Sequence, residues 1–257
     1  MALMQPSLGT EADTASFARD GFLVVPALAR AEAVAGMRDV ALDALHPLAG
    51  PAEFEADVGY PGAPLPGQAG AATPRRLLHA YARHSLFREW STGARVAEVV
   101  RRLLGQSRVL LSQCHHNCVM TKHPGHSSAT LWHQDVRYWS FDRPKLVSVW
   151  LALGAETPAN GALKVIPGSH RLEIDPSRLD DDLFLRPELA ANGRLIASAR
   201  TVPLQPGDAL FFSGRLFHAA GRNVTGEVKL SVVTTYHAAD NLPLPGTRSA
   251  RYPSIEL

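Results

Sequence analysis

Short apolar segments separated by turn residues fill the chain from residue 108 onward. Pro-Gly pairs mark the turns at residues 124–125, 167–168 and 206–207. Several short strands with such punctuation are typical of an antiparallel sandwich or barrel. We therefore expect a mainly β fold with flanking helices, with strands over residues 109–121, 129–135, 145–153, 161–166, 197–202, 209–212 and 228–237.

The first hundred residues have a mostly helical pattern. The expected elements are a helix over about residues 10–20, a short strand over 22–26, and helices over 30–45 and 86–104. Residues 49–74 are dense in Gly, Pro and Ala and predict a long loop without regular elements. Loops of that length often serve as lids, and a charged insertion over residues 176–192 is a second candidate.

Length and composition limit the number of domains and the kinds of partner that we expect. We expect a single domain over residues 1–257, with a helical part over about 1–105 and a β core over about 106–240. The net charge of +2 is too small to indicate a nucleic-acid or anionic-membrane partner. No apolar run has the length that spans a bilayer, and residues 1–6 lack a secretory signal pattern. The sequence therefore predicts a cytoplasmic protein with no nucleic-acid or membrane partner.

The two cysteines, Cys114 and Cys118, bracket a histidine pair and raise the question of a zinc site. Alpha carbons four residues apart on a strand are roughly 13 Å apart. That distance is too long for a disulfide and too long for both thiolates to bind one zinc ion. We expect both to be small buried side chains.

A metal-ligand pattern lies in Leu131-Trp132-His133-Gln134-Asp135, and a single histidine, His218, follows much later. On an extended strand His133 and Asp135 share one face, because strand side chains alternate. His218 ends an apolar strand, which directs it toward a barrel mouth. Two histidines and one carboxylate are the ligand set of non-haem Fe(II) oxygenases. The same ligands also serve zinc, so the pattern alone leaves a hydrolase open.

The chain resembles the phytanoyl-CoA dioxygenase family over roughly residues 108–240. The resemblance rests on several motifs in the family's order, namely Trp132-His133-Gln134-Asp135, Trp150, Asn160-Gly161-Ala162-Leu163, Pro167-Gly168-Ser169-His170, and Pro206-Gly207-Asp208-Ala209-Leu210-Phe211-Phe212 leading to His218.

The resemblance implies a double-stranded β-helix, the jelly roll of cupin-like proteins. It implies that His133, Asp135 and His218 hold Fe(II), that 2-oxoglutarate and O2 are co-substrates, and that a small molecule is hydroxylated with release of succinate and CO2. Related halogenases have a small residue where Asp135 stands. Asp135 therefore favours hydroxylation, or a desaturation or cyclisation variant.

The family binds the far carboxylate of 2-oxoglutarate through a basic residue, usually Arg, on the strand after the distal histidine. Lys229 occupies that position here and lacks the bidentate fork of arginine. Arg222 is the competing candidate, and Lys229 is favoured because its strand position allows an inward side chain. Further expected contacts of the co-substrate are Thr130, Lys122, Trp150 and Ser231.

The sequence also suggests which residues line the substrate pocket, and it leaves two other functions open. Tyr138 and Trp139 are expected to form an aromatic wall, and Arg75 and Arg76 to attract an anionic group. One rival is a divalent-metal hydrolase or isomerase on a cupin-like barrel, which would not need a dicarboxylate anchor such as Lys229. The other is a barrel that binds a ligand without turnover.

Overall fold

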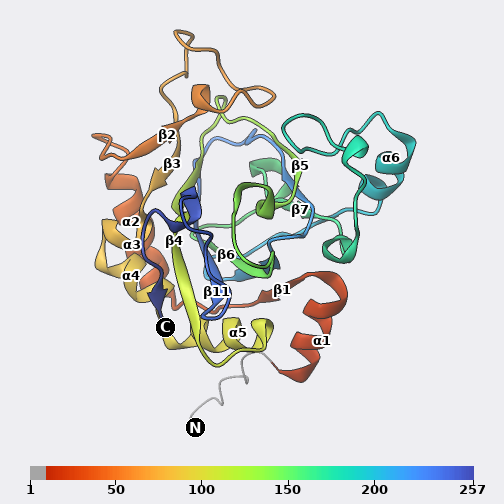
Figure 1. Ribbon diagram of the computed structural model, residues 1–257. Helices are drawn as coiled ribbons and strands as arrows, with labels where there is room; N and C mark the ends of the chain where they lie inside the picture. The colour runs from red at the N-terminus through yellow and green to blue at the C-terminus, as the bar shows by residue number, and fades with distance from the viewer. Residues whose placement is uncertain (1–9) are drawn as a thin grey trace.

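The computed structural model describes residues 10–257, in which two antiparallel sheets face each other (Figure 1). The start of the chain, Met1–Pro6, on which the expectation about a secretory signal rests, lies outside the described residues. No helix within the described part is long and apolar enough to cross a membrane. The fold class expected from the sequence, a jelly roll with flanking helices, is confirmed.

The larger sheet has the strand order β1-β9-β6-β11-β4-β3-β2, and β12 pairs with β4. Its strands are β1 (Phe22–Val25), β2 (Ala52–Phe54), β3 (Pro74–Leu78), β4 (Val109–Lys122), β6 (Leu146–Ala152), β9 (Ala209–Ser213), β11 (Lys229–Ala238) and β12 (Ile255–Glu256). The smaller sheet has the order β5-β10-β7-β8. It consists of β5 (Thr130–His133), β7 (Leu163–Val165), β8 (Arg200–Thr201) and β10 (His218–Ala220).

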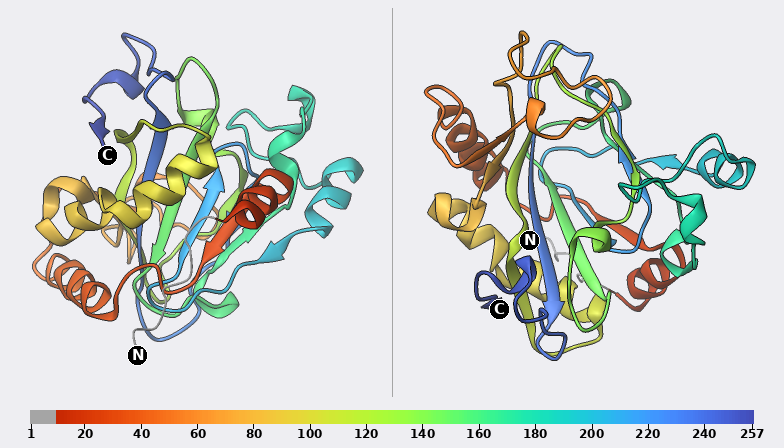
Figure 2. Two further views of the ribbon diagram at one scale, coloured as in Figure 1. Left: turned by 90° about the horizontal axis from the view of Figure 1, so that it is seen from below. Right: turned by 45° about the horizontal axis from the view of Figure 1, so that its top comes forward.

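The helices gather mainly on the outer side of the larger sheet (Figure 2). They are α1 (Glu11–Asp20), α2 (Ala31–Asp43), α3 (Ala80–Arg83), α4 (Ser85–Ser91), α5 (Ala94–Leu104) and α6 (Ala190–Ala197). α6 lies apart from the others, at the edge of the molecule near the smaller sheet.

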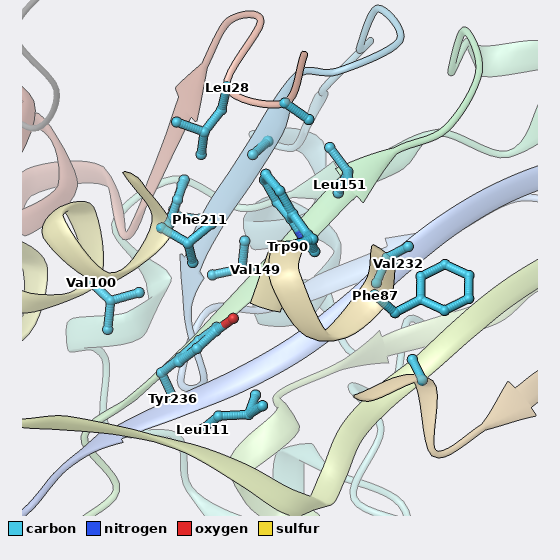
Figure 3. Close-up of a cluster of buried hydrophobic side chains, with 14 of the residues drawn as sticks. Leu28, Phe87, Trp90, Val100, Leu111, Val149, Leu151, Phe211, Val232 and Tyr236 are labelled. Atoms are coloured by element: carbon cyan, nitrogen blue, oxygen red, sulfur yellow. The ribbon is translucent and has the colours of Figure 1, made fainter. Parts of the chain in front are cut away.

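The main hydrophobic core fills the space between these helices and the larger sheet (Figure 3). Apolar residues of α5 recur at helical spacing and are buried, which turns one face of that helix to the sheet. Tyr236 of β11 is fully buried, and its hydroxyl donates to the carbonyl oxygen of Ser91, 2.7 Å away. This bond ties the central strand β11 to the end of α4. The helices cover one face of the larger sheet. Its other face points toward the smaller sheet and lines the interior between the two sheets.

The predicted helix over residues 86–104 is two helices, because the chain breaks at Thr92 and Gly93. Gly93 has an extended backbone, and a Cβ there would lie 2.8 Å from the carbonyl oxygen of Glu89. Only glycine fits this close approach without a shift of the backbone. The apolar periodicity continues across the break, which is why it predicts one helix.

Two other expectations about the chain were wrong. The segment 49–74 contains a 3-10 turn over Glu55–Asp57 and the short strand β2, which pairs with β3. The segment 197–202 is mostly the end of α6 and a connection, with a strand only at β8. In both places the strand is two or three residues long, too short for an alternating pattern to be recognised.

Candidate functional site

Three side chains converge between the sheets. β5 and β10 pair antiparallel, and His133 at the end of β5 lies opposite His218 at the start of β10. Asp135 follows as the first residue of a 3-10 helix, η2 (Asp135–Tyr138). One ligand atom from each of the three lies within 4.8 Å of the others, and all three residues are buried. The structure thus brings the three predicted metal ligands together.

The local backbone around the triad differs from the expectation. β5 ends at His133, so Asp135 does not lie on the strand but reaches the histidines from η2. β9 ends at Ser213, and a turn that begins at Gly214 precedes His218, which starts β10. Gly214 packs against η2, because its carbonyl oxygen accepts from the Val136 N–H, 3.1 Å away. This contact fixes the turn and η2 against each other.

Backbone hydrogen bonds set which nitrogen of each imidazole is free. Nδ1 of His133 lies 2.8 Å from the carbonyl oxygen of Leu131, and Nδ1 of His218 lies 3.0 Å from that of Leu216. A carbonyl oxygen only accepts, so Nδ1 carries the proton and Nε2 of the neutral ring keeps its lone pair. Burial lowers the pKa of both histidines and favours this neutral form. Both Nε2 atoms face Oδ1 of Asp135, at 3.8 and 3.6 Å.

The carboxylate of Asp135 is also held by two other side chains. Nε2 of His116 lies 3.0 Å from its Oδ1, and the Ser148 hydroxyl donates to its Oδ2 across 2.8 Å. Burial opposes the charge, but His116 and His218 hold the pKa of Asp135 below its usual range. Burial also opposes a charge on His116, yet Asp135 raises the pKa of His116 to about 9. Two neutral imidazole nitrogens and an ionised carboxylate are a donor set that fits a divalent cation such as Fe(II).

Sequence reasoning assigned no role to His116. On β4 it shares a face with Cys118, Met120 and Lys122, because strand side chains alternate. Cys118 and Met120 belong to the apolar cluster between the sheets, so this face points inward. The alternation that ends at Lys122 is the signal that could have identified His116 as an interior residue.

A cavity of about 460 Å³ opens beside the triad, within the size range of small-molecule sites. Arg76 and Thr130 line it together with the aromatic side chains of Tyr60, Tyr138 and Trp139. The predicted aromatic wall residues therefore do face the site.

Both candidate lids reach the site through aromatic side chains. Tyr60, from the 49–74 segment, has its hydroxyl oxygen 3.2 Å from that of Tyr138. Phe184, from the 176–192 insertion, packs edge-on against Tyr60 and His133, with ring centroids 5.6 and 5.8 Å apart. The two segments thus meet over the ligand His133.

The two neighbouring arginines expected to attract an anion have different surroundings. Arg75 is buried, ion-paired with Glu53 at 3.2 Å, and donates to the Thr130 hydroxyl. Arg76 lines the cavity, and its Nε, although 3.3 Å from Glu53 Oε1, is a buried donor without a hydrogen-bond partner among residues 10–257. Arg76 is therefore the arginine of this pair that can contact a ligand in the cavity.

The predicted co-substrate contacts fall into two groups. Thr130 lies beside the triad, in the wall of the cavity. Trp150, Lys229 and Ser231 instead surround the carboxylate of Glu156, which sequence reasoning did not single out. Oε1 of Glu156 accepts from Trp150 Nε1 at 2.7 Å and from Ser231 Oγ at 2.6 Å. Its Oε2 accepts from Lys229 Nζ at 2.9 Å, and all four residues are buried.

The other two basic candidates lie nearby. Lys122 is the cross-strand partner of Lys229, and its Nζ donates to the carbonyl oxygen of Ser128 at 2.7 Å. Burial and then the like charge of Lys229 lower the pKa of Lys122 to about 7. Arg222 donates to two carbonyl oxygens of the 125–127 turn, so its guanidinium is used to hold that turn.

Comparison with known proteins gives concordant matches. The family model described as phytanoyl-CoA dioxygenase matches residues 17–231. Ectoine dioxygenase of Sphingopyxis alaskensis is 26% identical over 248 residues, which cover 88% of this chain and 75% of the relative. Methylphosphonate hydroxylase of Gimesia maris is 28% identical over 165 residues, which cover 64% of this chain and 59% of the relative.

Two solved structures share the fold. The non-haem, α-ketoglutarate-dependent epimerase SnoN from nogalamycin biosynthesis superposes with a TM-score of 0.73 and 26% identity, covering 92% of this chain and 86% of SnoN. EctD from S. alaskensis, in complex with 2-oxoglutarate and 5-hydroxyectoine, superposes with a TM-score of 0.71 and 23% identity. That match covers 94% of this chain and 81% of EctD.

Proposed function

The chain belongs to the phytanoyl-CoA dioxygenase family, and from that premise we propose that it hydroxylates a small molecule at an Fe(II) centre held by His133, Asp135 and His218. It is an Fe(II)- and 2-oxoglutarate-dependent dioxygenase. The single observation that carries the proposal is the convergence of the three ligand atoms within 4.8 Å beside a cavity.

Each ligand is prepared for its role by a neighbour. The backbone carbonyls of Leu131 and Leu216 hold the protons of the two imidazoles on Nδ1, which leaves each Nε2 free to bind the metal. Ser148 fixes the orientation of Asp135. When bound, Fe(II) with 2-oxoglutarate and O2 would supply the oxidising capacity that abstracts hydrogen from a C–H bond, with succinate and CO2 as co-products.

The outcome we propose is hydroxylation, with desaturation or cyclisation as variants of the same chemistry. Asp135 is intact and ionised, so the position that a halide takes in the related halogenases is filled by a carboxylate. Tyr138 and Trp139 beside the triad offer aromatic faces against which a bound substrate can pack.

We assign the far carboxylate of 2-oxoglutarate to Lys229, with Ser231 and Trp150 as further donors and Thr130 at the metal end. Lys229 and Ser231 lie on one face of β11, and their partner Glu156 lies between the sheets with them. Their arrangement around a carboxylate supports the assignment, because it is the donor geometry that a carboxylate needs. Lys122 lies across from Lys229, and because its pKa is lowered to about 7, a bound carboxylate would favour its charged form.

The substrate we propose is a small molecule with an anionic group and a ring or apolar body. The anionic group would contact Arg76, whose Nε has no hydrogen-bond partner in the described part of the chain. The body would lie against Tyr138 and Trp139. We propose the cytoplasm as the compartment, because the fold of the described residues relies on no disulfide.

The proposal is tested by anaerobic reconstitution with Fe(II) and 2-oxoglutarate, followed by a metabolite screen in air for stimulated succinate formation. Anionic cyclic compounds are expected to stimulate succinate release, and the Asp135→Ala variant is expected to release none. Conversion of a compound without consumption of 2-oxoglutarate would instead support the rival hydrolase or isomerase.

A further inference from the structure

The anchor assigned to the co-substrate is already occupied by a carboxylate of the chain itself. Trp150 has one N–H and Ser231 one O–H, and both are donated to Oε1 of Glu156. Lys229 donates to the other oxygen, and Glu156 is only 1% exposed. A second carboxylate cannot receive the bonds from Trp150 and Ser231 while Glu156 stays in place.

We propose that Glu156 is an internal stand-in for the far carboxylate of 2-oxoglutarate and that the co-substrate binds by displacing it. This inference rests on the proposed function, which assigns Lys229 as the anchor. The exchange replaces one carboxylate with another against the same donors, so no buried donor is left without a partner. The buried charge of Lys229 is likewise neutralised before and after the exchange.

Glu156 has a short route out of the anchor. It lies in the turn after β6, and its neighbours Ala155 and Thr157 are exposed. A surface cavity of about 600 Å³ is lined by Ala155, Thr157 and Lys229, among others. The backbone of Glu156 is bridged to Leu204, because its N–H lies 2.8 Å from the Leu204 carbonyl oxygen and its own carbonyl oxygen lies 3.1 Å from the Leu204 N–H. The displacement that we infer therefore moves this bridge and the turn toward the cavity, together with the Glu156 side chain.

Arg38 of α2 is placed to receive the released carboxylate. It lines the same cavity, and its guanidinium lies against the turn, since a Cβ on Gly154 would be 3.1 Å from Arg38 Nη1. Arg38 forms no ion pair or hydrogen bond with another side chain within residues 10–257. Glu156 thus has a cation at each end of its movement: Lys229 without co-substrate and Arg38 with it.

The displaced state sets the affinity for 2-oxoglutarate. If the anchor is free in only about one molecule in ten, the apparent dissociation constant is about tenfold higher than that of the free anchor. Loss of the Glu156 carboxylate should therefore tighten binding, whereas loss of Arg38 should weaken it.

The test is calorimetric titration of 2-oxoglutarate into the Fe(II)-loaded protein without oxygen, which measures binding rather than turnover. Glu156→Gln and Glu156→Ala are expected to bind about tenfold tighter than the wild type. Arg38→Met is expected to bind about threefold weaker, and to have no effect when combined with Glu156→Ala. Glu89→Gln, an exposed glutamate of α4, is the matched control and should bind as the wild type does.

Unchanged or weaker binding in the Glu156 variants would overturn the inference, because a glutamate that merely positions Lys229 predicts weaker binding. Circular dichroism and thermal unfolding show whether each variant folds. If Glu156→Ala does not fold, Glu156→Gln and Arg38→Met still show whether the affinity for 2-oxoglutarate rises or falls as the inference predicts. Failure of the proposed function gives a different result: the wild type would not bind 2-oxoglutarate, or Lys229→Met would bind it equally well.

Discussion

The hydroxyl of Ser148 donates a hydrogen bond to Oδ2 of Asp135 across 2.8 Å, from β6 of the larger sheet to the η2 helix that follows β5 of the smaller one. Both side chains are fully buried. The metal ligand is thus oriented by the sheet opposite to the one that carries both histidines. The ligand geometry therefore depends on how the two sheets pack.

Removal of this hydroxyl should weaken metal binding without loss of the fold. Loss of a hydrogen bond that orients a ligand typically costs about tenfold to a hundredfold in metal affinity. We expect that range for Ser148→Ala in an anaerobic Fe(II) titration. Ser107→Ala, at an exposed position, is the control. Wild-type affinity in Ser148→Ala would show that Asp135 needs no orientation from β6.

The Asp135 carboxylate itself should be indispensable. Asp135→Ala removes the one anionic ligand and leaves His133 and His218 alone at the site. We expect no stoichiometric Fe(II) binding and no succinate formation from 2-oxoglutarate. Undiminished succinate release from this variant would refute the ligand assignment.

Lys229 should set the affinity for the co-substrate but not for the metal. A hydrogen bond to a charged group contributes about 1.5–3 kcal/mol, which corresponds to about tenfold to a hundredfold in the dissociation constant. Lys229→Met should lose that much affinity for 2-oxoglutarate while Fe(II) binding is retained. Lys229→Arg, which restores the usual residue of the family, should keep most of it. Equal loss in both variants would indicate a packing defect instead.

The stability of the protein should fall in mild acid through His115. Its Nε2 lies 2.7 Å from the Ser249 hydroxyl oxygen. Burial and then Arg248 lower the pKa of His115 from 6.5 to about 3. The unfolded chain therefore takes up a proton below pH 6.5 that the folded chain rejects, so stability is full above pH 6.5 and falls as the pH drops toward 3.

The slope of that loss is measurable. His115 alone accounts for up to about 1.4 kcal/mol per pH unit in the free energy of unfolding. Urea unfolding at pH 7 and pH 5 should show a smaller decline for His115→Asn than for the wild type. His126→Asn removes an exposed imidazole and is the control. Equal declines in the wild type and His115→Asn would place the acid sensitivity elsewhere.

The sequence predicts the elements that local patterns specify. Runs rich in apolar residues between turn residues identify the long strands β4, β6 and β11, each of which has at least seven residues. β6 and β11 are buried at every position, so they show no alternation. The His-x-Asp spacing identifies two ligands, and the place of His218 at the end of an apolar strand, together with the resemblance, identifies the third. The two-residue strand β8 carries too little pattern, and tertiary packing at Gly93 decides the break between α4 and α5.

Local sequence patterns do not predict contacts between side chains that are distant in the sequence and meet only in the folded chain. His116 and Ser148 come from different strands, and nothing in their neighbourhood in the sequence links them to Asp135. Glu156 lies in a turn with exposed neighbours and reads as a surface residue, yet Lys229 and Ser231, far along the chain, enclose its carboxylate. Long-range pairing of strands, not local composition, creates these contacts.

The central claim is that His133, Asp135 and His218 hold one Fe(II) ion to which 2-oxoglutarate binds. The most direct measurement is anaerobic titration of the wild type and His218→Ala, first with Fe(II) and then with 2-oxoglutarate. We predict one Fe(II) per wild-type chain, 2-oxoglutarate binding that is much tighter with the metal than without it, and loss of both in His218→Ala. Stoichiometric Fe(II) binding and metal-dependent binding of 2-oxoglutarate in His218→Ala would contradict the account.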